Sequence, residues 1–326
     1  MNHKNYGHQS NSPARILPKR LRKNSLLGLV TPSSSITPEL LDATVKKLEG
    51  LGFRVYFNDS ILDEYGYFAG KDEERANELM SMFSNKNVDA IFCVRGGYGA
   101  IRILDLLDYE IIRQNPKALM GYSDITALHA AIYNKTGLVS FHSPMGESDF
   151  NEFTVNTFMD ILVHPTEHYT YGYLREKNTE SNPEFDRYTI NPGQAEGVLT
   201  GGNISVLQSL IGTEYEPVFE DKIVYLEEIE EKTYKVDKML FHLLAATDLK
   251  KAAALVLGTF KNCNVNESPT ISLKQALDEL LKPLKIPVSY GLPFGHIDRK
   301  ITIPFGIKAK LNASNNTLEL LERAVI

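Results

Sequence analysis

The feature that most constrains the fold is a regular alternation of short apolar segments with longer amphipathic ones over the first half of the chain. The apolar segments have the length and composition of buried strands, and helical spacing follows each of them. Strands and helices that alternate in this way form a parallel sheet with helices on its faces. We therefore predict a doubly wound α/β domain with strands at 25–31, 54–57, 90–94 and 118–122 and helices at 38–49, 72–85 and 100–114.

The second half of the chain is organised differently. Residues 164–195 are rich in Pro, Asn and Gly, which interrupt regular structure, so we interpret them as an interdomain linker and a loop over the active site. Strands at 223–226, 253–257 and 287–290 and a closing hairpin around 312–316 follow. We expect four parts: a disordered tail at 1–24, a nucleophile-bearing α/β domain at 25–163, the linker at 164–195, and a smaller mixed-sheet α/β domain at 196–326.

Ser123 lies where the strand pattern at 118–122 changes directly into a helical one. A sharp strand-to-helix turn holds a hydroxyl outside the backbone hydrogen-bond ladder, and the first amides of the helix point toward an oxyanion formed beside it. Gly121 permits the close turn. Serine is also a common helix N-cap, so this segment alone leaves a structural role open.

The strand at 90–94 also runs into a turn, which contains Gly96, Gly97 and Gly99. Gly96 and Gly97 let main-chain N–H groups approach a ligand closely, as an oxyanion or phosphate cradle requires. The glycine spacing fits neither the dinucleotide fingerprint nor the P-loop. Because the carboxyl ends of parallel strands meet at one edge of a sheet, we expect Gly97 and Ser123 to face one pocket.

Seven short motifs together resemble the LD-carboxypeptidases, a family of serine peptidases that also includes the microcin C immunity peptidases. They cover most of the chain and lie at 28–34, 68–76, 95–99, 121–126, 197–203, 225–228 and 291–296. Each motif is short, but their order and spacing together are specific. The resemblance implies a Ser–Glu–His triad with the nucleophile on the first domain, and matching the motifs assigns it to Ser123, Glu227 and His296.

The chemistry of these residues agrees with that assignment. Serine is a weak nucleophile near neutral pH and needs a base within hydrogen-bond reach and a third group that orients the base. His296 follows a predicted strand, in a loop that suits an exposed catalytic side chain. Glu227 ends the strand at 223–226, where a carboxylate can accept an imidazole N–H. Its neighbour Glu228 is a rival, because alternation points the two side chains to opposite faces and only one should reach the pocket. The resemblance favours Glu227 and leaves Glu228 as a solvated or hinge-facing charge.

The remaining histidines are weaker candidates for the base. His129 and His242 lie in apolar helical patterns and are predicted to be packing residues, while His3 and His8 lie in the polar tail. His142, His164 and His168 are less easily dismissed. In the predicted mechanism His296 takes the proton from Ser123, Glu227 stabilises the imidazolium, and the backbone N–H groups of Gly97 and Asp124 hold the oxyanion.

Composition limits the possible partners. A net charge of -6 without a basic stripe argues against nucleic acid. Two distant cysteines and the absence of an H-E-x-x-H motif predict no disulfide scaffold, no metal site and no cofactor. No stretch reaches the roughly eighteen apolar residues that span a membrane, and the N-terminal tail lacks the apolar core of a secretory signal. We expect a cytoplasmic protein that binds no membrane.

The resemblance also suggests the substrate. It implies cleavage of an amide between an L-configured centre and a D-amino acid, as in release of terminal D-alanine from cytoplasmic murein tetrapeptides. Arg95 and Gly96 are candidate substrate-binding residues, with Arg95 as an anchor for the free carboxylate, although an arginine at a strand end is equally often structural.

Two other functions stay open. Aromatic stacking against the base would help to bind a peptide–nucleotide conjugate of the microcin C type. The chain has no tryptophan, so this stacking would fall to Tyr169, Tyr171, Tyr173 or Tyr188. A two-domain protein that binds a small peptide without chemistry is the non-enzymatic alternative. For the oligomeric state we expect a two-fold homodimer, the commonest arrangement.

Overall fold

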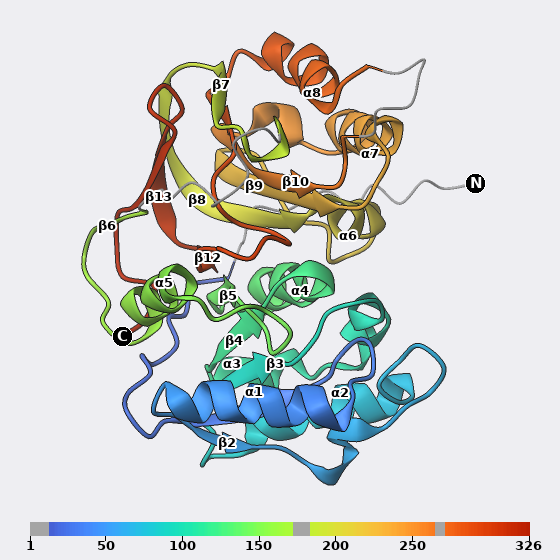
Figure 1. The fold of residues 1–326 in the computed structure, drawn as a ribbon. Coiled ribbons are helices and arrows are strands. Elements are labelled where there is room, and N and C mark those ends of the chain that lie inside the picture. The colour runs from blue at the N-terminus through green and yellow to red at the C-terminus, as the bar shows by residue number, and fades with distance from the viewer. Residues whose placement is uncertain (1–12, 172–182, 265–270) are drawn as a thin grey trace.

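The computed structural model describes residues 13–171, 183–264 and 271–326. It has two halves, stacked one above the other in Figure 1, and each is built around one sheet. The N-terminal half holds a mainly parallel six-stranded sheet, and the C-terminal half holds a mixed eight-stranded sheet. The predicted α/β class, with a parallel sheet followed by a mixed one, is confirmed.

The N-terminal sheet has the strand order β12-β5-β4-β3-β1-β2, with parallel pairing from β2 to β5. This order places the ends of β3 and β4 side by side, so the turns that follow them meet at one edge of the sheet. The strands are β1 (Leu26–Val30), β2 (Arg54–Tyr56), β3 (Ala90–Cys93), β4 (Ala118–Gly121), β5 (Ser140–His142) and β12 (Ile303–Phe305).

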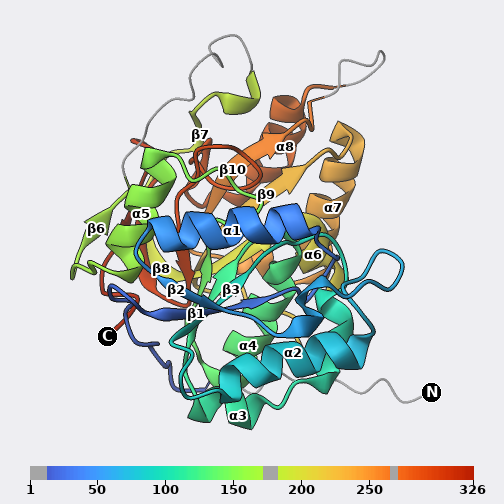
Figure 2. The same ribbon diagram turned by 60° about the horizontal axis from the view of Figure 1, so that its bottom comes forward.

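Helices cover both faces of this sheet because successive strand residues point to opposite sides. Phe92 belongs to the core shared with α1 (Pro38–Gly50) and α5 (Glu152–Leu162). Its neighbour Cys93 belongs to the opposite core, which the other helices cover, and Figure 2 shows β1–β3 between α1 and α2. Those helices are α2 (Asp72–Ser84), η2 (Ala100–Leu106), α3 (Tyr109–Gln114) and α4 (Thr126–Thr136).

The helix predicted at 100–114 is divided into η2, a 3-10 helix, and α3. The division falls at Asp108, whose side chain accepts hydrogen bonds from the amides of Glu110 and Ile111. An aspartate that caps a helix start in this way favours a new helix over a continuous one.

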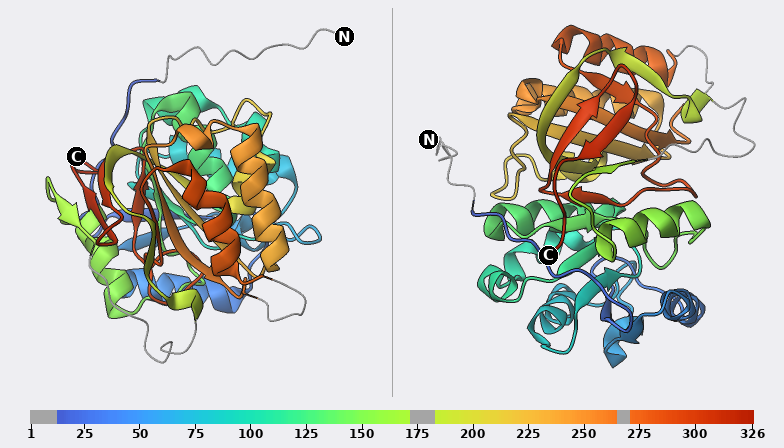
Figure 3. Two further views of the ribbon diagram at one scale, coloured as in Figure 1. Left: turned by 90° about the horizontal axis from the view of Figure 1, so that it is seen from above. Right: turned by 90° about the vertical axis from the view of Figure 1, so that its left-hand side faces the viewer.

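The C-terminal sheet has the order β6-β14-β13-β8-β9-β10-β11-β7, with β8 to β11 parallel. Helices cover one face, and Figure 3 (left) shows α7 and α8 lying over it. Among the described residues, no helix has both the length and the apolar character needed to cross a bilayer. The elements are β8 (Gln194–Asn203), α6 (Ile204–Ser209), β9 (Lys222–Ile229), α7 (Thr233–Ala246), η5 (Leu249–Lys251), β10 (Ala254–Lys261), α8 (Leu273–Leu281), η6 (Lys282–Leu284), β11 (Val288–Tyr290), β13 (Lys308–Asn312) and β14 (Thr317–Leu320).

Two predicted boundaries differ from the structure. The described parts of the predicted linker include β6 (Tyr169–Thr170) and β7 (Tyr188–Asn191), which form the two edges of the C-terminal sheet. Residues 13–24 of the predicted disordered tail pack on the N-terminal half, where Leu21 is buried and its amide donates to the carbonyl of Leu162 at 2.8 Å. Apolar residues among the basic ones explain this packing. Residues 1–12 and 172–182 lie outside the described part of the chain.

Strand β12 ties the two halves together. It comes from the last part of the chain, yet it pairs antiparallel with β5 at the edge of the N-terminal sheet. The chain end also lies beside the N-terminal half (Figure 3, right), where the amide of Ile326 donates to the carbonyl of Pro18. One continuous core includes Phe141 of β5, Phe305 of β12 and Tyr225 of β9, so the halves share their packing.

We predict that Phe305→Ala destabilises the whole protein. Phe305 is buried, and its ring lies 5.3 Å from that of Tyr133 and 6.4 Å from that of Tyr225. Truncating a buried phenylalanine lowers the free energy of unfolding by about 3–5 kcal/mol. Urea denaturation measures this loss. Phe241→Ala is the matched control, because Phe241 is 61% exposed and its loss should cost less than about 0.5 kcal/mol; equal losses would contradict the linking role of β12.

Candidate active site

Ser123 begins the 3-10 turn η3 (Ser123–Ile125) between β4 and α4. Its φ of +64° lies in the left-handed region, which residues other than glycine rarely occupy. Tyr122 takes the N-cap position, and the Ser123 Oγ instead lies 3.0 Å from Nε2 of His296. The alternative that Ser123 is a helix N-cap is therefore wrong, and its hydroxyl points to another side chain.

His296 reaches Ser123 from the C-terminal half, in the loop that follows β11. Its Nδ1 lies 2.7 Å from Oε2 of Glu227, which is fully buried. An ionised carboxylate can only accept, so Nδ1 carries a proton that it donates to Glu227, and in the neutral ring Nε2 accepts from the Ser123 hydroxyl. The geometry thus forms one hydrogen-bonded chain from carboxylate to imidazole to hydroxyl.

Glycine at position 295 allows this close contact. The backbone of Gly295 has φ +101°, and a β-carbon there would lie 2.8 Å from Oε2 of Glu227. Any side chain would therefore push the carboxylate away from the imidazole and would also strain the backbone.

Burial and pairing act in opposite directions on these two groups. Desolvation alone would raise the pKa of Glu227, but the charge and hydrogen bond of His296 outweigh it and hold the pKa below the usual carboxyl range. Desolvation would lower the pKa of His296, and the adjacent Glu227 carboxylate more than reverses this. The carboxylate therefore stays ionised, and the imidazole is a stronger base than a free histidine.

Glu228 occupies a different environment from the one predicted. It is buried, and it accepts hydrogen bonds from the Asn203 side chain at 2.9 Å and the Ser205 amide at 2.9 Å. Burial, followed by the charge of Glu227, raises its pKa to about 6. The prediction of a solvated charge is wrong because α6 begins at this point and its free amides need an acceptor.

The predicted glycine turn lies directly beside Ser123. A β-carbon on the buried Gly96 would lie 3.0 Å from Cβ and 3.2 Å from Oγ of Ser123. Gly97 has φ +105° and packs against Ser34. These contacts place Gly96 of this turn beside Ser123, and the expectation that Gly97 and Ser123 face one pocket stays a prediction.

Asp124 fixes the turn through its side chain. Its buried Oδ2 accepts hydrogen bonds from the Ser33 hydroxyl at 2.6 Å and the Ala100 amide at 2.8 Å. These bonds join the loops after β1, β3 and β4. Burial raises the pKa of Asp124 despite these donors. Sequence reasoning assigned Asp124 a backbone role only, so this side-chain role adds to it.

Arg95 lies at the start of the same turn and is half-exposed. Its Nη1 donates to the carbonyl of Ser35 at 3.0 Å, and its Nε lies 3.6 Å from a carboxylate oxygen of Glu147. Both the structural and the substrate-anchoring interpretations fit these contacts.

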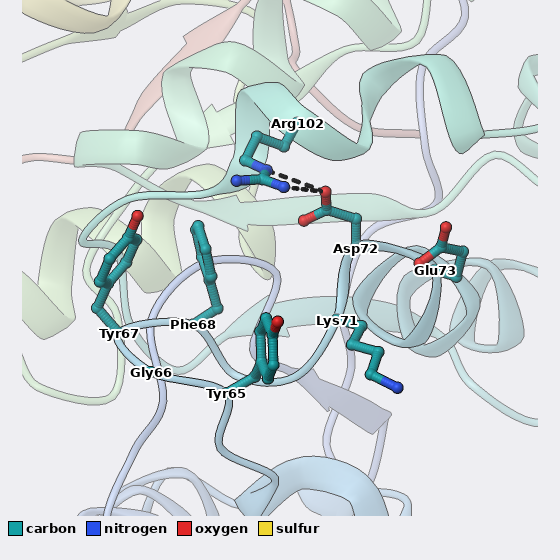
Figure 4. Close-up of a pocket in the computed structure, with 8 residues that line it drawn as sticks. All are labelled: Tyr65, Gly66, Tyr67, Phe68, Lys71, Asp72, Glu73 and Arg102. Carbon is teal, nitrogen blue, oxygen red and sulfur yellow. Dashed lines mark hydrogen bonds and ion pairs between the residues drawn. The ribbon is translucent and has the colours of Figure 1, made fainter.

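A cavity of about 540 Å³ lies next to the turn, bordered by Tyr67, Phe68 and Arg102 (Figure 4). Arg102 is paired there with Asp72. Tyr98 belongs to the glycine turn, and its ring is 5.7 Å from the ring of Phe68, which borders this cavity. Tyr65 and Tyr67 are more than half exposed.

The burial and the contacts of the other histidines show which of them are packing residues. His129 is buried with both ring nitrogens bonded, to the Ser140 hydroxyl at 2.8 Å and the Gly121 carbonyl at 2.9 Å, so its predicted packing role is confirmed. His242 is exposed, and its predicted packing role is wrong. His142 is buried behind the site, with its ring 5.6 Å from those of Tyr122 and Tyr225.

Sequence reasoning missed two residues beside the imidazole. Tyr122 contacts the His296 ring edge-to-face at 4.9 Å, and the buried Lys300 donates to the Tyr122 hydroxyl at 3.0 Å. Tyr122 could have been suspected from its position next to Ser123. Nothing in the local sequence identifies Lys300, because its partners come from the other half of the chain.

We predict that Glu227→Gln lowers the pKa of His296 below the ordinary histidine value of about 6.5. Without the carboxylate, desolvation is the dominant influence on the imidazole. NMR titration of labelled histidines measures the change. Glu228→Gln is the control, because Glu228 contributes least among the groups that raise this pKa; an equal or larger fall in that variant would contradict the assignment of Glu227 as the imidazole's partner.

Comparisons with known proteins agree with this geometry. Two family models match, the LD-carboxypeptidase N-terminal domain over residues 27–143 and the LD-carboxypeptidase C-terminal domain over residues 196–311. A probable murein peptide carboxypeptidase of Bacillus subtilis is 37% identical over 303 residues, 92% of either chain. The microcin C7 self-immunity protein MccF of Escherichia coli is 28% identical over 278 residues, 79% of this chain and 80% of the relative.

Solved structures show the same fold. MccF in complex with aspartyl sulfamoyl adenosine has a TM-score of 0.87 at 26% identity, covering 95% of this chain and 100% of the other. A muramoyltetrapeptide carboxypeptidase from Oxalobacter formigenes has a TM-score of 0.78 at 29% identity, covering 91% and 98%. With both domain models matched and the Bacillus subtilis relative aligned over almost its whole length, this chain belongs to the LD-carboxypeptidase family.

Proposed function

We propose that the protein is a serine carboxypeptidase that releases the terminal D-alanine from murein tetrapeptides. The observation that carries the proposal is the hydrogen-bonded chain from Glu227 through His296 to Ser123. Relatives from Bacillus subtilis and Pseudomonas aeruginosa are named for carboxypeptidase action on murein peptides, which supports this substrate class.

In the proposed mechanism, Nε2 of His296 takes the proton from Ser123 as Oγ attacks the carbonyl carbon of the scissile amide. Glu227 holds the ring in the required tautomer and stabilises the imidazolium. The imidazolium then gives its proton to the D-alanine nitrogen, and the C–N bond breaks to leave an ester on Ser123. Water, deprotonated by the same imidazole, attacks the ester, the serine recovers its proton, and the shortened peptide is released.

The glycine turn supplies the oxyanion site in this proposal. The amides of Gly97 and Asp124 follow the ends of β3 and β4, on the two turns that meet at Ser123. Such donors stabilise the negative charge that forms only during the reaction. Gly96 leaves room for the substrate beside Ser123, and Arg95 is the candidate partner for the terminal carboxylate.

Hydrolysis of a peptide–nucleotide conjugate is the second candidate, supported by the likeness to MccF. The tyrosines that could stack on a base support it only weakly. Tyr171 is buried and donates to the carbonyl of Thr302, and Tyr188 stacks on Tyr290 at 4.8 Å. Tyr173 lies outside the described residues. A purely binding role is disfavoured because binding requires no serine–histidine–glutamate chain. The cytoplasmic location and the two-fold homodimer stay predictions.

We predict that the wild-type protein releases D-alanine from L-Ala-γ-D-Glu-meso-diaminopimelyl-D-Ala. Ser123→Ala and His296→Ala should each lower kcat by about 10⁶-fold, and Glu227→Gln by about 10⁴-fold, the losses found when other serine-peptidase triads are disrupted. Amino-acid analysis of the product measures release, and circular dichroism verifies folding.

The same peptide ending in L-alanine is the matched control for stereochemistry and should not be cleaved. No release of D-alanine by folded wild type, together with cleavage of an aspartyl–adenylate conjugate, would replace the murein function with the second candidate. Activity that survives Ser123→Ala would refute the serine mechanism for either substrate.

We also predict that Gly96→Ala lowers kcat/KM by about 10²-fold while leaving stability nearly unchanged. Gly96 does not have a positive φ, so alanine fits the backbone, but its methyl group would crowd the Ser123 side chain. Gly50→Ala is the control, because a β-carbon at the end of α1 meets nothing within 4 Å. Equal activity of the two variants would show that the Ser123 side chain tolerates a methyl group at position 96.

A further inference from the structure

Lys300 is a buried cation with no carboxylate partner among the residues that the structure describes. Only 4% of the residue is exposed. Its Nζ donates to two neutral hydroxyls, that of Tyr122 at 3.0 Å and that of Ser148 at 3.3 Å. An ammonium group taken out of water costs free energy unless it is fully paired, so such a placement requires a reason.

The partners of Lys300 all belong to the other half of the protein. Its backbone amide donates to the Thr154 hydroxyl of α5 at 3.1 Å. Two residues earlier, the carbonyl of Asp298 accepts from the Asn151 side chain at 2.9 Å. The loop that carries His296 is thus docked on the N-terminal half through several hydrogen bonds, among them those of the buried Lys300 ammonium.

The Tyr122 ring lies between the Lys300 ammonium and the His296 imidazole and contacts both. The Lys300 Nζ lies 4.2 Å from the centre of the Tyr122 ring, and the same ring meets the imidazole edge-to-face at 4.9 Å and 61°. A cation over a tyrosine face is held there by the ring's charge distribution, more strongly away from water. Tyr122 immediately precedes Ser123, so these contacts join the loop that carries His296 to the turn that carries Ser123.

We propose that Lys300 is a positioning residue for catalysis, which holds the His296 imidazole in line with Ser123 by fastening its loop to Tyr122. The proposal rests on the proposed serine-peptidase function. Lys300 acts through Tyr122 and touches neither substrate nor the reacting atoms.

The charges around the imidazole define the expected electrostatic effect. Glu227 and Glu228 of β9 favour its protonated form, while Lys300 on its own loop opposes it. His142 of β5 also faces this cluster, but burial lowers its pKa to about 3, so it is neutral. The carboxylates of Glu227, Glu147 and Asp298 favour the charged form of the ammonium. Removing the Lys300 charge leaves desolvation as the main influence against protonation, so the pKa of His296 should rise.

The test is Lys300→Met, which keeps the length of the side chain and removes its charge. We expect kcat for D-alanine release to fall about tenfold or more, with KM nearly unchanged, because a misplaced base slows chemistry without weakening binding. The acid limb of the kcat/KM profile, and the His296 pKa measured by NMR, should both move to higher pH.

Lys117→Met is the matched control. Lys117 is also a buried lysine, bonded to the carbonyls of Met82 and Asn85, and burial lowers its pKa to about 8, as it does for Lys300. It precedes β4, whereas Tyr122 and Ser123 follow that strand. Its replacement should lower stability but leave kcat and the His296 pKa at wild-type values.

The outcomes separate the two proposals. A wild type without D-alanine release refutes the proposed substrate, while NMR titration still tests Lys300. An unchanged His296 pKa in folded Lys300→Met, or equal effects of the two lysine variants, overturns the positioning role. If Lys300→Met does not fold, Tyr122→Phe tests the proposal instead. This variant keeps the ring and removes the hydroxyl that Lys300 binds. A wild-type kcat in Tyr122→Phe overturns the proposal.

Discussion

The buried hydrogen bond between Glu227 and His296 is the interaction on which the site depends. A carboxylate removed from water is costly unless charged or strongly donating groups surround it, and His296 Nδ1 is the donor on its Oε2. The imidazole in turn is oriented by that carboxylate, which leaves its second nitrogen free for Ser123. Loss of either partner would leave the other buried without its main source of stabilisation.

This pair reaches the nucleophile only because the two halves are docked. Ser123 follows β4 of the N-terminal sheet, whereas Glu227 lies in β9 and His296 follows β11, both strands of the C-terminal sheet. The common core, β12 and the loop around Lys300 set the distance between them. Because catalytic rates fall steeply with errors of about 1 Å, the packing between the halves is part of the catalytic design.

Local patterns predict much of this molecule. The strands at 26–30, 90–93 and 118–121 lie where apolar runs between helical segments predicted them, and the turn at Ser123 follows from the last of these. Assigning Glu227 and His296 needed the family resemblance, since residue chemistry alone left Glu228 and several histidines open. The structure now brings the matched pair to hydrogen-bond distance of each other and of Ser123.

The features that sequence reasoning missed depend on contacts distant along the chain. Glu228 is buried because α6 begins beside it, and Leu21 is buried because α5 lies beneath the segment predicted as tail. Lys300 has partners about 150 and 180 residues away, so no local pattern marks it. Strand β12 contains Pro304, which argues against a central strand but is acceptable at an edge.

That edge strand has a consequence for how the chain is made. Strands β1 to β5 emerge early in synthesis, but β5 pairs on its outer side with residues 303–305, near the end of the chain. Until those residues are available, the backbone donors and acceptors of β5 form an open edge to which another chain could add. Once β12 is in place, Pro304 lacks an N–H and interrupts the new outer edge. The nascent N-terminal half therefore has an open edge while about half of the chain is synthesised, between β5 and β12, and residues 303–305 finally cover it.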